Sequence, residues 1–244
     1  MSSVDILAIF AHPDDVELAV GGTLLKMKSF DYRTGALDVT QGEMGTRGTV
    51  EGRAEEAAEA ANILKLSVRE NLGLADGHVF ADDESRKKLV RVLRRLKPKL
   101  ILTHQDGDPH PDHNHIVQLV RESARLASMR KYDEETGDEK IKVPIVAHNV
   151  FSRRVQPSFI VDISGFLEEK MSAIRAHKSQ FYNPDSTEPE TRLTTKEFLT
   201  DLESRSRYFG SMIGVAAGEP FFVREALNVQ DPIKLLTRPM NLYS

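Results

Sequence analysis

The chain has 244 residues, of which 40% are hydrophobic and 29% charged, and its formal net charge is −4. This balance is typical of a globular protein with a full core, and the small negative charge gives no reason to expect nucleic acid or an anionic membrane as a partner. The absence of cysteine excludes disulfides and thiolate metal sites, so any metal must be held by imidazole and carboxylate groups.

The chain starts with a strand pattern soon after its first residue. Val4–Phe10 is strongly apolar, and it is not preceded by the basic leader and apolar stretch of a signal peptide. No later segment approaches the roughly 20 apolar residues that a membrane span requires. We therefore expect a cytoplasmic protein without a membrane partner.

Strand-like and helix-like segments alternate through the first half of the chain. The predicted strands are Val4–Phe10, Ala36–Thr40, Val68–Leu74 and Leu100–Thr103, and the predicted helices are Val16–Tyr32, Arg53–Leu66, Asp83–Leu96 and Ile116–Arg130. This order predicts an α/β fold, a doubly wound and mostly parallel Rossmann-like sheet with helices on both faces. Ligands of such sheets bind at the carboxyl ends of the strands, and the first and fourth strands are neighbours in the usual order.

The second half of the chain predicts further elements of the same domain. The expected strands are Val146–Phe151 and Ser158–Ile163, the expected helices are Phe166–His177 and Lys196–Met212, and the expected loops are Lys131–Lys142 and Phe181–Thr194. We interpret residues 1–244 as a single domain. Residues 1–130 would form its Rossmann-like core, and residues 131–244 would complete it.

One residue pattern occurs twice, each time directly between a predicted strand and a predicted helix. His12-Pro13-Asp14-Asp15 follows the first strand, and His110-Pro111-Asp112-His113 follows the fourth. Pro at the first position of a helix and acidic residues in its first turn are common, so a well-capped helix would explain most of the first motif. It would not explain the histidine, nor the three imidazoles and one carboxylate that the second motif and His115 bring together.

The two motifs can meet at one edge of the sheet and share a metal ion. Catalytic zinc usually has three protein ligands and a water, and His12, Asp15 and His113 would form such a set. Spacing alone does not decide whether Asp14 or Asp15 is the ligand. A His2Asp set also binds Fe²⁺, so zinc is the expected cofactor and iron an alternative. We interpret His104 as a supporting residue rather than a ligand.

The two His/Asp motifs, together with Gly21-Gly22, resemble those of the LmbE-like, or PIG-L-type, zinc deacetylases. Further segments also resemble this family: Gly42–Thr49, Arg53–Ala57, Glu70–Gly77 and His177–Gln180. The resemblance covers nearly the whole chain. Within the family, Gly42–Thr49, Arg53–Ala57 and Glu70–Gly77 resemble the branch that deacetylates N-acetylglucosaminyl malate in bacillithiol biosynthesis.

The resemblance implies a role for each matching residue. His12, Asp15 and His113 match the zinc ligands, Asp14 the general base, His110 the imidazole that faces the developing oxyanion, and Arg53 a substrate-contacting arginine. It implies a homo-oligomer such as a hexamer. It leaves open whether Asp14 or His110 protonates the leaving amine.

Other candidate substrate contacts are less specific. The guanidinium groups of Arg47 and Arg53 suit the carboxylates of malate. Their alternatives are a solvated loop charge for Arg47 and a helix-surface pair with Glu56 for Arg53. His177 and Gln180 could line the rim of the site, although a histidine at a helix C-terminus is also favoured by the helix dipole.

We therefore expect a zinc-dependent hydrolase that removes the acetyl group from an N-acetylglucosaminyl conjugate, with the malate conjugate as the first candidate. A deacetylase of another acetamido sugar or pseudo-disaccharide is the alternative within the enzyme class. A nucleotide-binding Rossmann module is disfavoured because the first strand is followed by a histidine motif and not by G-x-G-x-x-G. A non-catalytic metal or carbohydrate binder would need neither Asp14 nor His110.

Overall fold

The computed structural model describes residues 3–134, 139–151, 155–231 and 233. Its strands form a seven-stranded sheet in the order β3-β2-β1-β4-β5-β7-β6. Strands β1 to β5 pair in parallel, and β7 pairs antiparallel with both β5 and β6. The strands are β1 (Ile6–Phe10), β2 (Thr34–Thr40), β3 (Val68–Leu74), β4 (Leu100–Thr103), β5 (Ile145–Asn149), β6 (Phe159–Asp162) and β7 (Gly218–Phe222).

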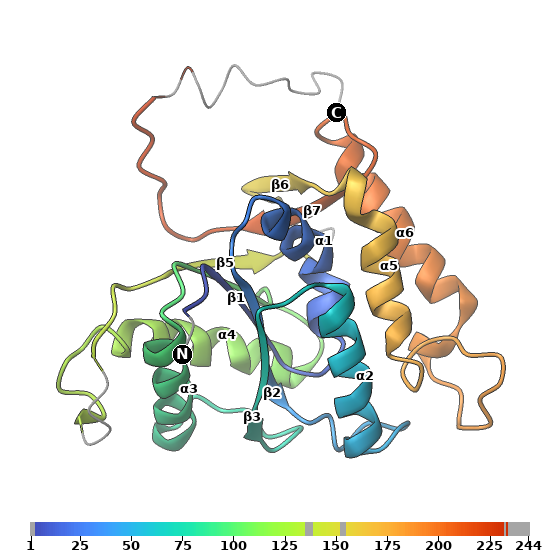
Figure 1. Cartoon of the computed structure of the whole chain (residues 1–244), viewed down its shortest axis with the longest axis horizontal. Helices are drawn as coiled ribbons and strands as arrows, with labels where there is room; N and C mark the ends of the chain where they lie inside the picture. Colours follow the sequence, from blue (N-terminus) through green and yellow to red (C-terminus); the bar gives the residue numbers. More distant parts are fainter. Residues whose placement is uncertain (1–2, 135–138, 152–154, 232, 234–244) are drawn as a thin grey trace.

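Helices cover both faces of this sheet (Figure 1). Helices α3 and α4 lie on one face, and α1, α2 and α5 lie on the other, with α6 beside α5. The helices are α1 (Asp15–Ser29), α2 (Val50–Ile63), α3 (Asp83–Leu96), α4 (Pro111–Leu126), α5 (Leu167–Ala176) and α6 (Lys196–Ser211). The predicted α/β class, the parallel core and the adjacency of the first and fourth strands are confirmed.

Strand β1 is apolar along its whole length because both of its faces are buried. Leu7 and Ile9 belong to the hydrophobic cluster under α3 and α4. Ile6, Ala8 and Phe10 belong to the cluster under α1. A strand covered on both sides reads as a continuous apolar run and not as an alternating one, as this chain shows.

Two differences from the predicted elements affect the picture of the fold. Helix α4 begins at Pro111 and not at Ile116, so the second histidine motif lies in the first turn of the helix. Strand β7, Gly218–Phe222, was not predicted, because its Gly218 and Pro220 are typical of turns and edges. The predicted loop at residues 131–142 lies partly outside the described residues.

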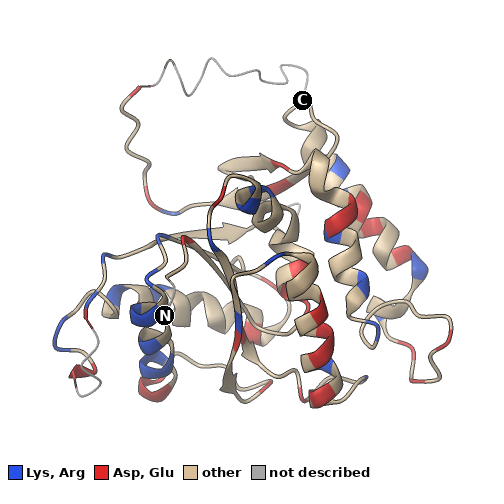
Figure 2. Cartoon of the chain, in the orientation of Figure 1, with Lys and Arg blue, Asp and Glu red and all other residues tan. Residues whose placement is uncertain are grey.

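Surface charge is segregated by helix but locally balanced. Figure 2 shows that Lys and Arg residues are frequent on α3 and that Asp and Glu residues are frequent on α2. Several cations of α3 pair within the chain, among them Arg86 with Glu122 at 2.9 Å and Lys87 with Asp83 at 2.8 Å. Among the described residues, every helix is too short or too polar to cross a bilayer.

Candidate metal centre and active site

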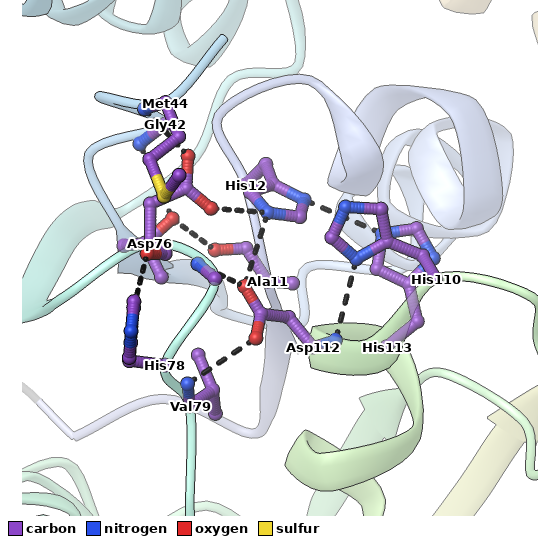
Figure 3. Close-up of polar contacts among 12 residues, drawn as sticks. Ala11, His12, Gly42, Met44, Asp76, His78, Val79, His110, Asp112 and His113 are labelled. Carbon is purple, nitrogen blue, oxygen red and sulfur yellow. Dashed lines mark hydrogen bonds and ion pairs between the residues drawn. The ribbon is translucent and has the colours of Figure 1, made fainter.

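The site lies where the parallel neighbours β1 and β4 end. Ile6 pairs with Leu100 and Ala8 with Leu102, so the carboxyl ends of the two strands stand side by side. His12 and Asp15 follow β1, while His113 comes from the first turn of α4 (Figure 3). The backbone N–H of Ala11 donates to His104 Nε2 at 3.1 Å, which ties the two strand ends together.

His12, Asp15 and His113 present three donor atoms to one point. His12 Nδ1 lies 3.2 Å from Asp15 Oδ2, His113 Nε2 lies 3.3 Å from His12 Nδ1, and His113 Nε2 lies 3.3 Å from Asp15 Oδ2. These nitrogen and oxygen atoms form a nearly equilateral triangle that could hold a metal ion. We call this set the ligand triangle.

The spacing of the ligand triangle fits a zinc ion. Ligands about 2.0–2.1 Å from a tetrahedral zinc ion lie about 3.3 Å from one another, which follows from the geometry of a tetrahedron. The observed edges have this length, so the side chains would need little movement to bind. The set of two imidazoles and one carboxylate also suits Fe²⁺. The triangle leaves a fourth tetrahedral position for water or substrate.

The carboxylates around the triangle favour a positive charge. Burial opposes a charge on His12, but hydrogen bonds with Asp112, Asp15 and Asp76 prevail and raise the pKa of His12 to about 12. Burial likewise opposes a charge on His113, but Asp15 and Asp108 raise the pKa of His113 to about 10. On each ring the nitrogen that faces Asp15 must be without a proton to bind a metal ion, so metal binding should release protons.

Each histidine of the triangle has a carboxylate behind it. His12 Nε2 lies 3.0 Å from Asp76 Oδ1, and His113 Nδ1 lies 3.1 Å from Asp108 Oδ1. Such partners fix the tautomer and the orientation of a metal-binding imidazole. Neither role was predicted from the sequence, although Asp76 stands in Glu70–Gly77, and Asp108 shortly before the second motif.

Replacement of Asp76 by asparagine is expected to weaken zinc binding by about 10- to 100-fold, the usual cost of losing such a partner. The amide keeps the size of the side chain but removes the charge that orients His12. Competition with a chromophoric chelator measures the affinity. The control is Asp185→Asn, which removes an exposed carboxylate that is not part of the ligand triangle. Equal zinc affinities of the two variants would show that Asp76 does not support the metal site.

Asp14 lies beside the triangle in an unusual backbone conformation. Its φ is 142° and its ψ is −28°, values that side-chain-bearing residues rarely adopt. Strain of this kind costs about 1–3 kcal/mol and persists only where the surroundings enforce it. Here the surroundings are Arg53, whose Nη2 donates to Pro13 O at 2.9 Å and lies 3.4 Å from Asp14 Oδ2.

Glycine at position 42 allows Arg53 to reach Asp14. Arg53 Nη1 donates to Gly42 O at 2.9 Å. A Cβ at position 42 would lie 1.9 Å from that nitrogen, and Gly42 also has a φ of +68°. The predicted alternative for Arg53, a surface pair with Glu56, is not what the structure shows: Arg53 is buried, and Glu56 accepts from Ser179.

The environment of Asp14 suits proton transfer. Burial raises the pKa of Asp14 to about 6, against the opposing effect of the Arg53 charge. Burial would also raise the pKa of Asp15, but the charges of His113 and His104 hold it well below the ordinary value. The pKa values of the two neighbouring carboxyl groups are thus driven apart, one toward neutral pH and one toward permanent ionisation, a pattern typical of a base beside a ligand.

His110 lies on the open side of the triangle. Its ring centroid is 4.8 Å from that of His12 and 4.7 Å from that of His113. Its Nδ1 accepts from the backbone N–H of Asp112 at 3.3 Å, so the neutral ring carries its proton on Nε2. Burial and the charges of His113 and His12 lower the pKa of His110. The ring is therefore a neutral donor facing the site.

The remaining predicted substrate residues are buried rather than at the rim. His177 is 0% exposed and lies 3.3 Å from Glu17 Oε2, beneath the site. Gln180 Nε2 donates to the backbone oxygen of Arg47 at 2.9 Å. Arg47 is itself buried, with Nε 3.3 Å from Glu188 Oε2. The structure thus gathers the catalytic and metal candidates but leaves these three in supporting positions.

The chain is similar to a known protein family, to curated proteins and to solved structures. Residues 7–124 match the PIG-L family, described as GlcNAc-PI de-N-acetylase. The diacetylchitobiose deacetylase of Thermococcus kodakarensis is 31% identical over 72% of this chain and 70% of its own length. A crystal structure of a conserved Thermus thermophilus protein has a TM-score of 0.82 and 37% identity, over 93% of this chain and 97% of that one.

Two other relatives carry different names. A probable N-acetyl-α-D-glucosaminyl L-malate deacetylase 2 of Bacillus anthracis is 26% identical over 72% of this chain and 81% of its own length. A 4-oxalmesaconate hydratase of Pseudomonas putida is 26% identical over 71% of this chain and 73% of its own length. Similarity therefore groups the chain with proteins of more than one substrate, and the residues of the site must decide the reaction.

Proposed function

The chain belongs to the PIG-L family, and on this premise we propose that it is a metal-dependent hydrolase that removes the acetyl group from an N-acetylglucosaminyl conjugate. The observation that supports this reaction best is Asp14, a buried carboxyl group that Arg53 contacts directly beside the ligand triangle and that is not one of its three ligands. A hydrolase needs a base at that place, whereas a metal-binding protein without activity would need only the triangle.

The ligand triangle would hold the metal, with zinc as the proposed ion. A zinc ion bound there supplies Lewis-acid polarisation of the acetyl carbonyl and activates water. Asp76 and Asp108 keep the two imidazoles in the orientation that binding requires. Asp15, held ionised by its histidine neighbours, contributes the negative charge of the set.

Asp14 is the proposed general base. It takes one proton from the attacking water, whose oxygen forms a bond to the acetyl carbon. The carbon–nitrogen bond then breaks, and the amine leaves with the proton that Asp14 returns, so the products are acetate and the free amine. His110 Nε2–H faces the side on which the carbonyl oxygen becomes negative. A donor of this kind commonly contributes roughly 3 kcal/mol to the transition state.

The acetamido group is proposed to stand on glucosamine, in keeping with the names of two relatives. The malate conjugate that the sequence predicts is one candidate, and a conjugate with a second sugar is the other. Cytoplasmic location and assembly into a homo-oligomer such as a hexamer stay predictions.

The experiment is a product assay on zinc-loaded protein with N-acetylglucosaminyl malate and N,N′-diacetylchitobiose. Release of amine and acetate in equal amounts from either substrate is the expected result. Folded, zinc-loaded protein that releases neither product from these or other acetamido sugars would contradict the proposed reaction.

A further inference from the structure

The sequence predicts that the guanidinium group of Arg47 contacts a negatively charged substrate, yet this side chain is buried. Arg47 lies on the loop after β2, and that loop is tied to the metal centre. Asp76 Oδ2 accepts from the backbone N–H of Met44 at 3.0 Å, while Asp76 Oδ1 contacts His12 (Figure 3). The same loop also packs against Arg53 at Gly48. A Cβ at this position would lie only 3.3 Å from Arg53 Cγ.

The guanidinium group of Arg47 is already paired with Glu188, which lies in the loop between α5 and α6. Arg47 Nε lies 3.3 Å from Glu188 Oε2, and the backbone N–H of Gly48 donates to Glu188 Oε1 at 3.0 Å. Arg47 Nη2 donates to Ser186 Oγ in the same loop. The Gly48 N–H, with help from Arg47, lowers the pKa of Glu188, so the carboxylate is charged at neutral pH. It binds both groups as a substrate carboxylate would.

The other predicted substrate arginine is also paired, since Arg53 contacts Asp14 and the backbone of Pro13. The loops after β2 and β3 also expose two large apolar side chains. Met44 is 69% exposed and Phe80 is 51% exposed. Phe80 directly follows Val79, whose N–H donates to Asp112 beside His12. Glu43, next to Met44, adds a carboxylate that accepts from the N–H of Asp76.

We propose that Glu188 takes the place of a substrate carboxylate on Arg47, and that the site therefore selects glucosaminyl conjugates whose aglycone is uncharged. This inference rests on the proposed deacetylase function and specifies its substrate class. A dicarboxylate aglycone must displace Glu188 or lie beside it and Glu43, and like charges repel. An uncharged sugar ring need not displace Glu188 and is not repelled by the two carboxylates. Its C–H groups can pack against Met44 and Phe80.

Glu188→Gln tests the inference, with Glu190→Gln as the matched control. Glu190 is an exposed carboxylate two positions along the same loop, so its replacement makes the same change in net charge. The readout is the ratio of kcat/KM for N-acetylglucosaminyl malate to kcat/KM for its dimethyl ester, in which two added methyl groups remove both charges. Because a charge-assisted hydrogen bond to Arg47 becomes available, we expect Glu188→Gln to raise this ratio at least about tenfold.

The unmodified protein should prefer the ester, and Glu190→Gln should have the ratio of the unmodified protein. The double variant Arg47→Met, Glu188→Gln should lose the gain, which separates a freed guanidinium group from a loosened loop. Preference of the unmodified protein for malate, or a ratio in Glu188→Gln equal to that of Glu190→Gln, would overturn the inference.

Binding of malate, measured by calorimetry on the same variants, decides the question independently of turnover. Tighter binding to Glu188→Gln than to Glu190→Gln, by about tenfold, is expected. Equal binding would reject the role of Glu188. Absence of amine release from every substrate would instead reject the proposed deacetylase function, so the two failures are distinguishable.

Discussion

Replacement of Asp14 by asparagine is expected to lower kcat by about 10²- to 10⁴-fold, the range for loss of a general acid–base group. Asparagine has nearly the same size and can accept from Arg53, but it cannot take a proton from water. Asp14 is outside the ligand triangle, so the zinc content should stay at that of the unmodified protein. The measurement is the rate of amine release from the best acetamido sugar, with zinc content determined on the same sample.

Because the backbone of Asp14 is strained, the folding of this variant must be checked separately from its activity. Asparagine tolerates unusual backbone conformations better than most residues, so the fold should survive the change. A thermal unfolding curve of Asp14→Asn that overlaps that of the unmodified protein, together with the lost activity, would assign the defect to chemistry. A variant that retains zinc and at least a tenth of the activity would exclude Asp14 as the base.

Replacement of His113 by alanine is expected to remove one corner of the ligand triangle. Two protein ligands hold zinc much more weakly than three, so the affinity should fall by more than the roughly 10- to 100-fold expected for the supporting carboxylates. Activity should fall with it, to the level of chelated protein. Equilibrium dialysis against zinc measures the first effect, and amine release measures the second.

His115→Ala is the matched control for this experiment. His115 lies on the same helix, two residues further on, and its ring contacts Phe80 at a centroid distance of 4.8 Å instead of the triangle. This variant should bind zinc as the unmodified protein does. If both variants bound zinc equally well, or if both lost it, the ligand triangle would not be the metal site.

The sequence predicted the elements that carry the site because their signals are local. Strand β1 is apolar throughout, and His12 follows it before a proline that suits a helix start. Helix α4 shows the same order of residues. Once β1 and β4 are neighbours in a parallel sheet, the two motifs must lie at the same edge, whereas the choice of Asp15 over Asp14 as a ligand came from the family resemblance.

The supporting residues could not be anticipated in the same way, because their partners are distant in the chain. Asp76 is 64 residues from His12, and its role depends on where the loop after β3 turns. Glu188 is 141 residues from Arg47, so the ion pair between them could not be predicted from the sequence. Arg53 contacts the backbone of Pro13, 40 residues away in the chain, and its contact with a substrate stays a prediction.

Strand β7 illustrates a second limit. Its sequence, Gly-Glu-Pro-Phe-Phe, has the residues of a turn, but Glu219 is buried and accepts from the backbone of Gly22 and Thr23 in α1. Lys170 of α5 pairs with Glu219 at 2.6 Å. Tertiary contacts of this kind override local propensity, and propensity is all that a single sequence supplies for such a segment.

The most direct test of the central claim is a metal titration of activity. Protein stripped with a chelator is supplied with increasing zinc, and amine release from an N-acetylglucosaminyl substrate is followed. We predict no turnover in the stripped protein and a linear return of activity that ends at about one zinc ion per chain, as one triangle of three ligands requires. Full activity in the stripped protein would contradict the claim that the ligand triangle holds the metal on which the reaction depends.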